Sequence, residues 1–349
     1  MLLKTILNGI YYSGMQTVCA PLTRGVGSIL MLHHVRNEPD QEFAPNSHLS
    51  VSPEFLDIAI FRLKQDGYRF VSMDQMAKLL ESGEASRSES QVIAITLDDG
   101  YRDNLVHAVP IFRRHEIPFT IYVSPGLTEA KDTLWWEDLE QIIRQRNKID
   151  VDLPEGRHKF STTTISEKDD AYRKLLEILV SRVSEDQQRE IIAKLSAAYN
   201  HDAAAHVRNQ VMTWRDLQHI CKDPLCTIGA HTMGHYALAR LPEKLAYEEM
   251  QNSRYLISKK IDQPVSHFAY PYGYPDAAGV REFEFARELG FRTAVTTRHG
   301  VIYSEHTQHL TALPRISLNG SYQSMRYLRT LISGVTTRIS NKGGKLNVA

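Results

Sequence analysis

The sequence predicts an α/β fold built on a parallel barrel. Val92 to Leu97 is an apolar, β-branched run with the length of a fully buried strand. A helical pattern over residues 104–115 and a second strand over residues 119–123 follow it, so strands and helices alternate as in parallel sheets. With 349 residues, 42% of them hydrophobic, the chain can bury the core of one large α/β domain.

Composition limits the partners and the compartment. The 41 basic residues balance the 41 acidic ones, so no global field draws the chain to nucleic acid or to an anionic membrane, and we expect a neutral partner. The three cysteines, Cys19, Cys221 and Cys226, are an odd number with no C-x-x-C pair, which favours free thiols in a reducing compartment. We therefore expect a cytoplasmic protein, and the oligomeric state stays open.

Residues 1–27 are predicted to be an amphipathic segment. Polar residues and glycines interrupt the apolar run around Ile6 and Ile10, so the segment is no transmembrane span. We expect a short helix packed on the barrel. A signal peptide ending near Val18-Cys19-Ala20 is the alternative.

The first part of the barrel is expected over residues 28–130. Ser28 to Leu32 is predicted to be its first strand and to place His33 and His34 at the strand end. A Ser-Pro cap at residues 52–53 starts the next helix. The elements predicted after it are a helix over residues 73–80, a polar loop over 81–91, and the strand, helix and strand described above.

Residues 131–210 break the alternation of strands and helices. An amphipathic helix opens at Trp135 and Trp136, and a long helical pattern runs over residues 171–199, so we expect an α-helical insertion. The barrel resumes over residues 211–321. Its predicted elements are strands near residues 227–230, 268–270, 292–296 and 313–318, with helices over 242–261 and 280–289. Residues 322–349 form a basic tail, which we expect to be solvated.

Two adjacent carboxylates, Asp98 and Asp99, end the central strand, and Gly100 follows them. Sites in α/β folds form at the carboxyl ends of parallel strands. Adjacent side chains that leave a strand point in different directions. We therefore expect one carboxylate to hold a metal ion and the other to act on a water molecule, and a plain Asp-Asp-Gly turn is the alternative.

A second motif, H-T-M-G-H at residues 231–235, follows the apolar run of residues 227–230. If His231 opens a helical turn, both imidazoles face the same way with metal-ligand spacing. Two histidines and one carboxylate leave an open position on a divalent ion, which is typical of catalytic sites. The motif lacks the glutamate of H-E-x-x-H metalloproteases, so Asp98 would supply the base.

A third motif, Y-P-Y-G at residues 270–273, again follows an apolar run. Together with T-L-D-D-G and H-T-x-x-H, in this order, it resembles the polysaccharide deacetylases of the NodB-homology family (carbohydrate esterase family 4). The resemblance spans roughly Ser28 to Ser317 and implies a distorted (β/α)7-type NodB barrel that carries the insertion. It also implies a divalent metal ion and hydrolysis of N-acetyl groups from saccharides that contain N-acetylglucosamine. Zinc is the expected ion, although two histidines and one carboxylate suit several metals.

The resemblance assigns roles to individual residues. Asp98 would be the general base, and the backbone N–H of Tyr272 would form part of the oxyanion hole. The metal ligands would be Asp99, His231 and His235.

Two departures from the family pattern affect the catalytic residues. Many relatives carry an arginine just before the Pro-aromatic pair, where this chain has Tyr270, and Arg315 could replace it by pairing with Asp98, with a surface ion pair as the alternative. Many relatives also carry a Leu-x-His motif that supplies the general acid, which is missing here. The chain is more similar to the branch with a Tyr-His-x-Val motif on the first strand, which makes His33 the first candidate acid and His34 the second.

Other functions stay open at this point. The same scaffold could hydrolyse a cyclic amide or an O-acetyl ester, or the chain could be a catalytically silent carbohydrate-binding protein. Trp135 and Trp136 could stack on sugar rings, although anchoring the core is the commoner role of such a pair.

Overall fold

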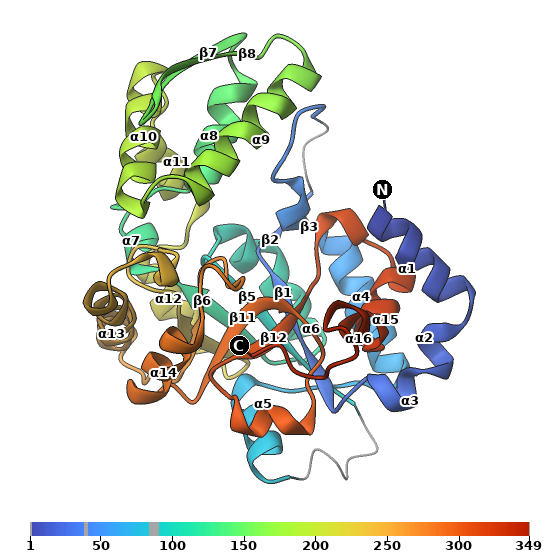
Figure 1. Cartoon of the computed structure of the whole chain (residues 1–349). Helices are drawn as coiled ribbons and strands as arrows, with labels where there is room; N and C mark the ends of the chain where they lie inside the picture. Colours follow the sequence, from blue (N-terminus) through green and yellow to red (C-terminus); the bar gives the residue numbers. More distant parts are fainter. Residues whose placement is uncertain (1, 38–40, 84–90, 349) are drawn as a thin grey trace.

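The computed structural model describes residues 2–37, 41–83 and 91–348, and a closed barrel of seven parallel strands lies at its centre (Figure 1). The strands pair in the order β1, β12, β11, β10, β9, β6 and β5, and β5 pairs back with β1. The predicted α/β fold with a (β/α)7-type barrel is confirmed. The barrel strands are β1 (Gly27–Leu32), β5 (Val92–Leu97), β6 (Phe119–Val123), β9 (Cys226–Ala230), β10 (His267–Ala269), β11 (Thr293–His299) and β12 (Leu313–Ser317).

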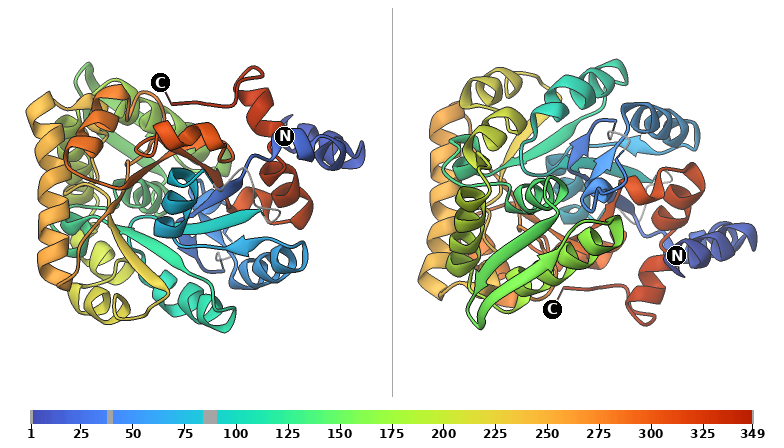
Figure 2. Two further views of the ribbon diagram at one scale, coloured as in Figure 1. Left: turned by 90° about the horizontal axis from the view of Figure 1, so that it is seen from below. Right: turned by 90° about the horizontal axis from the view of Figure 1, so that it is seen from above.

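The barrel strands are buried because helices cover their outer face. Every residue of β1, β5 and β6 is buried, as expected for parallel strands in an α/β fold. Figure 2 views the barrel from below and from above, with helices around the strands. The surrounding helices are α4 (Pro53–Gln65), α5 (Met73–Glu81), α6 (Val109–Arg114), α7 (Pro125–Thr128), α12 (Trp214–Ile220), α13 (Glu243–Ile261) and α14 (Val280–Glu288).

Short elements complete the barrel. A π-helical turn over Asn104–Ala108 precedes α6, and β4 (Arg69–Phe70) pairs with the first residues of β5. β2 (His34–Val35) continues from β1 and pairs with β3 (Ser50–Val51). The Ser52 hydroxyl accepts a hydrogen bond from the Phe55 N–H at 3.1 Å, which is the helix cap expected from the Ser-Pro pair.

The insertion stands on one end of the barrel and has a hydrophobic core of its own (Figure 1). Leu139, Leu175 and Leu179 are fully buried within it. Its elements are α8 (Trp135–Arg144), β7 (Lys148–Leu153), β8 (Gly156–Ser161), α9 (Ile165–Ser181), α10 (Glu185–Ala198) and α11 (Ala203–Gln210).

The insertion is mainly helical, as predicted, but differs from the expectation in two places. The antiparallel β7–β8 hairpin was not predicted, and it buries Ile149, Val151 and Leu153 on one face. The long helical pattern over residues 171–199 is two helices, because the Ser184 hydroxyl caps α10 by accepting from the Gln187 N–H at 3.2 Å.

Both ends of the described chain form helices. α1 (Leu2–Tyr12) is the short helix expected near the N-terminus, and it is followed by α2 (Met15–Val18) and α3 (Ala20–Thr23). The expectation of a solvated tail after residue 321 is wrong. Tyr327, Leu328 and Ile332 are buried, so α15 (Met325–Ile332) packs on α1, and α16 (Val335–Ser340) packs on α3. Among the described residues, no helix is both long enough and apolar enough to cross a membrane.

Candidate active site

Asp98 and Asp99 lie at the carboxyl end of β5 and face different partners. The Asp98 N–H donates to the Leu32 carbonyl at 3.0 Å, which holds this corner to the neighbouring strand β1. Asp99 has a left-handed backbone with φ of 67°, a conformation that aspartate tolerates better than most residues. This turn sends the Asp99 carboxylate toward two histidines, while the Asp98 carboxylate meets Arg315. The structure therefore has the divergence expected of adjacent side chains at a strand end.

The H-T-M-G-H motif after β9 forms a loop, so the expectation of a helical turn is wrong. Thr232 and His235 have left-handed backbones with φ of 59° and 57°, which interrupts the helical repeat. The imidazoles converge nevertheless, because Nε2 of His231 lies 3.4 Å and Nε2 of His235 lies 3.1 Å from Asp99 Oδ1. The three ligand atoms lie within 4.8 Å of one another.

These three side chains fit a divalent metal ion. All three are buried, and no hydrogen-bond partner among the described residues reaches Asp99 Oδ1. His231 Nδ1 lies 2.7 Å from the Ala269 carbonyl, so this nitrogen donates and Nε2 keeps its lone pair for an ion. A buried carboxylate oxygen that faces two imidazole nitrogens and accepts no hydrogen bond is satisfied when a cation binds. The donor set is the three-ligand pattern of catalytic metal sites.

Arg315 binds Asp98 through a bidentate ion pair inside the barrel. Nη1 donates to Asp98 Oδ1 at 2.8 Å, and Nη2 donates to Oδ2 at 2.7 Å. Arg315 is only 1% exposed, so the alternative of a surface ion pair is wrong. Burial by itself opposes the charge on Asp98, but the guanidinium outweighs it and holds the pKa of Asp98 below its usual value. The ion pair keeps this carboxylate ionised and fixes its orientation.

His33 lies at the end of β1 beside the paired carboxylate. Its Nε2 atom is 4.0 Å from Asp98 Oδ2, and the side chain lines the cleft that contains the candidate metal ligands. Burial lowers the pKa of His33, although Asp99 and Asp98 act in the opposite direction. The fold therefore favours the neutral imidazole, and it places this imidazole beside an ionised carboxylate.

His34 occupies a different environment. Its Nδ1 atom lies 2.5 Å from Asp103 Oδ2, and its Nε2 atom lies 2.8 Å from Glu137 Oε1. Burial opposes the charge on this imidazole, but Glu137 and Asp103 outweigh it and raise the pKa of His34 to about 9. Because both ring nitrogens are engaged and the side chain lies outside the cleft lining, His34 is placed to join the barrel to the insertion.

Tyr272 follows β10 in a left-handed conformation, with φ of 61°. Among the described residues, no acceptor binds its N–H, which is the group that the family resemblance implies for the oxyanion hole. Its hydroxyl accepts a hydrogen bond from Trp135 Nε1 at 2.8 Å, and its ring contacts the His235 ring at 5.0 Å between centroids. The insertion therefore holds the Tyr272 side chain against a candidate metal ligand.

A cleft of about 740 Å³ lies between the barrel end and the insertion. The three candidate metal ligands, Asp98 and His33 form part of its floor. Trp135 and Trp136 line it and are also buried in the core of the insertion, so the pair anchors that core, and its place in the cleft keeps stacking on sugar rings as a prediction. The ring of Trp136 lies 5.0 Å from that of His235.

Sequence reasoning missed two groups of residues near the site, one behind His34 and one in the wall of the cleft. The first is the pair of carboxylates that bind His34, namely Asp103 and Glu137. An unusual number of acids on the buried face of α8 was the feature that could have indicated such a partner. The second is the wall formed by α9, where apolar side chains recur at every fourth residue: Tyr172, Leu176 and Val180.

Comparison with known proteins agrees with this geometry. The family model for polysaccharide deacetylases matches residues 85–152 and 185–294, just over half of the chain. The chain belongs to the polysaccharide deacetylase family. This membership supports a deacetylase hydrolase with a carbohydrate substrate. No curated protein matches the chain.

Several solved structures share the fold of this deacetylase family member. The structure of the Streptococcus pyogenes deacetylase PplD in complex with acetate is 19% identical, has a TM-score of 0.58, and aligns over 87% of this chain and 97% of its own. IcaB from Ammonifex degensii is 17% identical with a TM-score of 0.53, and it aligns over 87% of this chain and 96% of its own. A de-N-acetylase from Aggregatibacter actinomycetemcomitans is 12% identical with a TM-score of 0.53, and it aligns over 87% of this chain and 98% of its own. At these identities the likeness shows the fold alone.

Proposed function

We propose that this protein is a metal-dependent deacetylase that removes N-acetyl groups from poly- or oligosaccharides containing N-acetylglucosamine. One observation carries the proposal. The cleft brings three candidate metal ligands, Asp99, His231 and His235, next to a carboxylate that a buried arginine keeps ionised. A metal site beside an oriented general base is what hydrolysis of an unactivated amide requires.

Asp98 acts as the general base. Its carboxylate takes a proton from a water molecule in the cleft, and the water oxygen forms a bond to the acetyl carbon. Arg315 holds both carboxylate oxygens, so the base keeps one orientation while it gains and loses the proton. The Asp99 carboxylate points toward His231 and His235, so in this proposal it is a metal ligand and not a base.

His33 delivers the proton to the leaving amine. The proton that Asp98 has taken from water passes to His33 Nε2, 4.0 Å from Asp98 Oδ2, and then to the nitrogen as the C–N bond breaks. The products are acetate and a free amino sugar. A neutral imidazole near a carboxylate can serve in this relay because histidine gains and loses protons near neutral pH.

The Tyr272 N–H stabilises the negative charge that develops on the acetyl oxygen. The left-handed turn at this residue leaves the N–H without an acceptor among the described residues. A donor in such a position contributes on the order of 3 kcal/mol to the transition state. When bound to Asp99, His231 and His235, a divalent ion supplies Lewis-acid polarisation and lowers the pKa of water; zinc suits two imidazoles and one carboxylate.

The wall of the cleft suits a saccharide. Trp135, Trp136 and Tyr172 line the side that the insertion contributes, and aromatic rings bind the apolar faces of sugar rings. Asn46 and Asn319 lie in the same cleft and offer hydrogen bonds to hydroxyl groups.

The test is release of acetate from N-acetylglucosamine oligomers, with chelator and with added zinc. We expect metal-dependent release by the wild type and none by Asp98→Asn. His107→Gln is the matched histidine control and should retain turnover, because His107 is exposed and lies outside the cleft lining. Parallel assays with O-acetylated sugars and cyclic imides distinguish an N-deacetylase from an O-acetyl esterase and from a hydrolase of cyclic amides. Turnover of those substrates alone, or equal turnover by Asp98→Asn, would overturn the proposal.

A further inference from the structure

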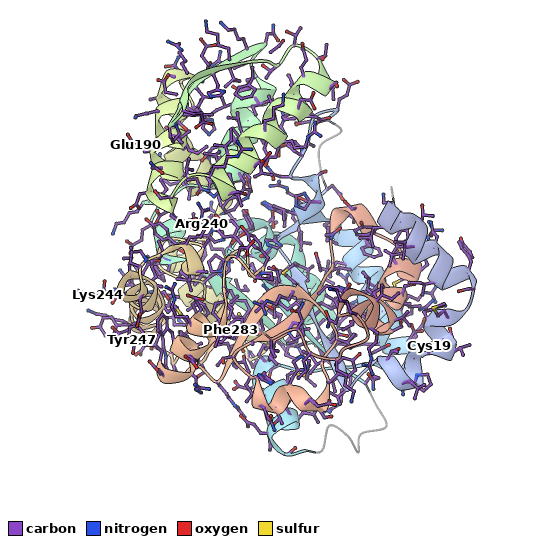
Figure 3. The ribbon with its side chains drawn as sticks, in the orientation of Figure 1. Cys19, Glu190, Arg240, Lys244, Tyr247 and Phe283 are labelled. Carbon is purple, nitrogen blue, oxygen red and sulfur yellow. The ribbon has the colours of Figure 1, made fainter. Side chains whose placement is uncertain are left out.

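The helices at the two ends of the chain form one outer layer on the side of the barrel. This terminal layer consists of α1–α3 together with α15 and α16. It lies at the edge of the molecule in the view of Figure 1 and in both views of Figure 2. In Figure 3, Cys19 marks the junction of α2 and α3 at that edge. The outer face of this layer therefore points away from the barrel.

Exposed hydrophobic side chains concentrate in the terminal layer. Thirteen large hydrophobic side chains are exposed among the described residues, and six of them lie in α1–α3. Leu7 and Ile10 face inward and are buried, so α1 already packs its inner face. The exposed set is made of Leu3, Ile6, Tyr12, Met15, Val18 and Leu22, with Ile339 on the adjacent α16. At 100° per residue, Leu3 and Ile6 lie on the same side of α1 as Leu7 and Ile10, so this outward face borders the buried stripe of α1 and continues along α2 and α3.

The charge around this outward face has one sign. Residues 1–37 and 306–349 contain no aspartate or glutamate, although the whole chain is neutral. Arg329 pairs with Asp66, and Lys345 pairs with Glu305. The other basic residues of the layer have no carboxylate partner in the described part of the chain: Lys4, Arg24, Arg326, Arg338 and Lys342.

The layer is fixed to the barrel and is not a frayed end. The Thr23 hydroxyl donates to the Ser333 carbonyl at 2.7 Å, and the Tyr303 hydroxyl donates to the Thr23 carbonyl at 2.6 Å. Gly334, with φ of 76°, lies so close that a Cβ atom would come within 1.8 Å of the Thr23 oxygen. Arg326 donates to the Tyr12 hydroxyl at 3.0 Å. These contacts hold the apolar side chains in place on the surface.

We propose that the terminal layer docks the protein on the surface of a lipid bilayer that contains anionic lipids. Exposed apolar side chains on helices whose charged residues are all basic are the pattern of segments that lie in the membrane interface. Basic residues near such a surface are attracted to anionic headgroups within a Debye length. A second copy of this chain is the poorer occupant, because a twofold contact would bring two basic surfaces without acids together.

The test is flotation of the full-length protein with vesicles of phosphatidylcholine, with and without phosphatidylglycerol. We expect the wild type to float with the anionic vesicles at low salt and to be released as salt rises. The double variant Val18→Ser/Leu22→Ser should lower vesicle binding about tenfold or more, since it removes two large apolar side chains from the face. Val280→Ser is the matched control, because Val280 is equally an exposed aliphatic residue but lies on α14.

Several outcomes would overturn the proposal. The wild type could fail to float with anionic vesicles at low salt, or could bind both vesicle types equally at every salt concentration. If Val280→Ser loses as much vesicle binding as the double variant, the terminal layer is not the surface that binds the membrane. Light scattering could also show that the wild type is a dimer and that the double variant is a monomer. If the wild-type dimer does not bind vesicles, the face is a self-association surface. Circular dichroism and thermal melting establish that both variants are folded.

Discussion

A buried histidine joins the barrel to the insertion, and its replacement should change how stability depends on pH. His34 on β2 binds Asp103 after β5 and Glu137 on α8, at 2.5 and 2.8 Å. Glu137 also binds His206 on α11, with 2.9 Å between Oε2 and Nε2. The Tyr101 ring packs against the His34 ring at a tilt of 32°, with 3.5 Å between centroids. The protonated imidazole is thus the cation at the centre of a contact between two parts of the molecule.

The magnitude follows from the pKa of His34. The fold raises this pKa from 6.5 to about 9, so the folded state binds the proton more tightly than the unfolded state. The resulting stabilisation is fully present below pH 6.5 and is lost as the pH rises through about 9. At about 1.4 kcal/mol for each tenfold change in proton affinity, it amounts to roughly 3 kcal/mol. The lowered pKa of Glu137 reflects the same contact and adds nothing further.

The assay is urea denaturation of the wild type, His34→Gln and His48→Gln between about pH 6 and pH 10. The wild type should lose roughly 3 kcal/mol more over this range than His34→Gln, because glutamine keeps hydrogen-bonding groups but carries no proton to lose. His48 is exposed, and its one hydrogen bond within the described residues is to the Pro45 carbonyl at 2.9 Å, so His48→Gln should behave as the wild type. Identical pH dependence in the wild type and His34→Gln would refute the reasoning.

The remaining predictions concern the cleft. Asp99→Ala or His235→Ala should lower metal content and turnover together, whereas Asp98→Asn should keep the metal and lose turnover. Elemental analysis and the acetate assay check both expectations. Full metal occupancy in the Asp99 and His235 variants would contradict their role as ligands. Arg315→Met should cost roughly 3 to 5 kcal/mol in urea denaturation, because it leaves a buried carboxylate unpaired; a loss below about 1 kcal/mol, typical of surface pairs, would contradict this. His33→Ala should keep the metal and slow amide substrates roughly 10²- to 10⁴-fold while sparing activated aryl acetates, since only the amine needs protonation to leave; equal slowing on both would remove His33 as the acid.

The sequence carried enough information for the barrel and for the position of the site. Strand composition located β1, β5, β6 and β12 within a residue or two, because buried parallel strands are nearly continuous apolar runs. The two carboxylates and the histidine motif could be placed at one edge of the sheet, because parallel strands all end there. These inferences depend on local pattern and on the geometry of one fold class.

The parts that could not be predicted depend on tertiary contacts. Thr232 and His235 adopt left-handed backbones that no local pattern in H-T-M-G-H indicates. The partners of His34 come from residues 69 and 103 positions away along the chain. The basic tail forms α15 and α16 because α1 and α3 pack against them.

Arg315 brings to Asp98, the proposed base, the positive charge that a motif arginine supplies in many relatives. Position 270, where many relatives carry an arginine, holds a tyrosine whose hydroxyl donates to the Thr311 carbonyl at 2.8 Å and whose ring packs on Phe268. The guanidinium comes instead from β12, two strands along the barrel from Asp98 on β5, with β1 between them. Because a barrel points side chains from several strands into one interior, the base needs a positive charge at a place in space and not at a place in the sequence. The ion pair of Arg315 with Asp98 meets that need, so loss of the usual arginine is compatible with an oriented and ionised general base.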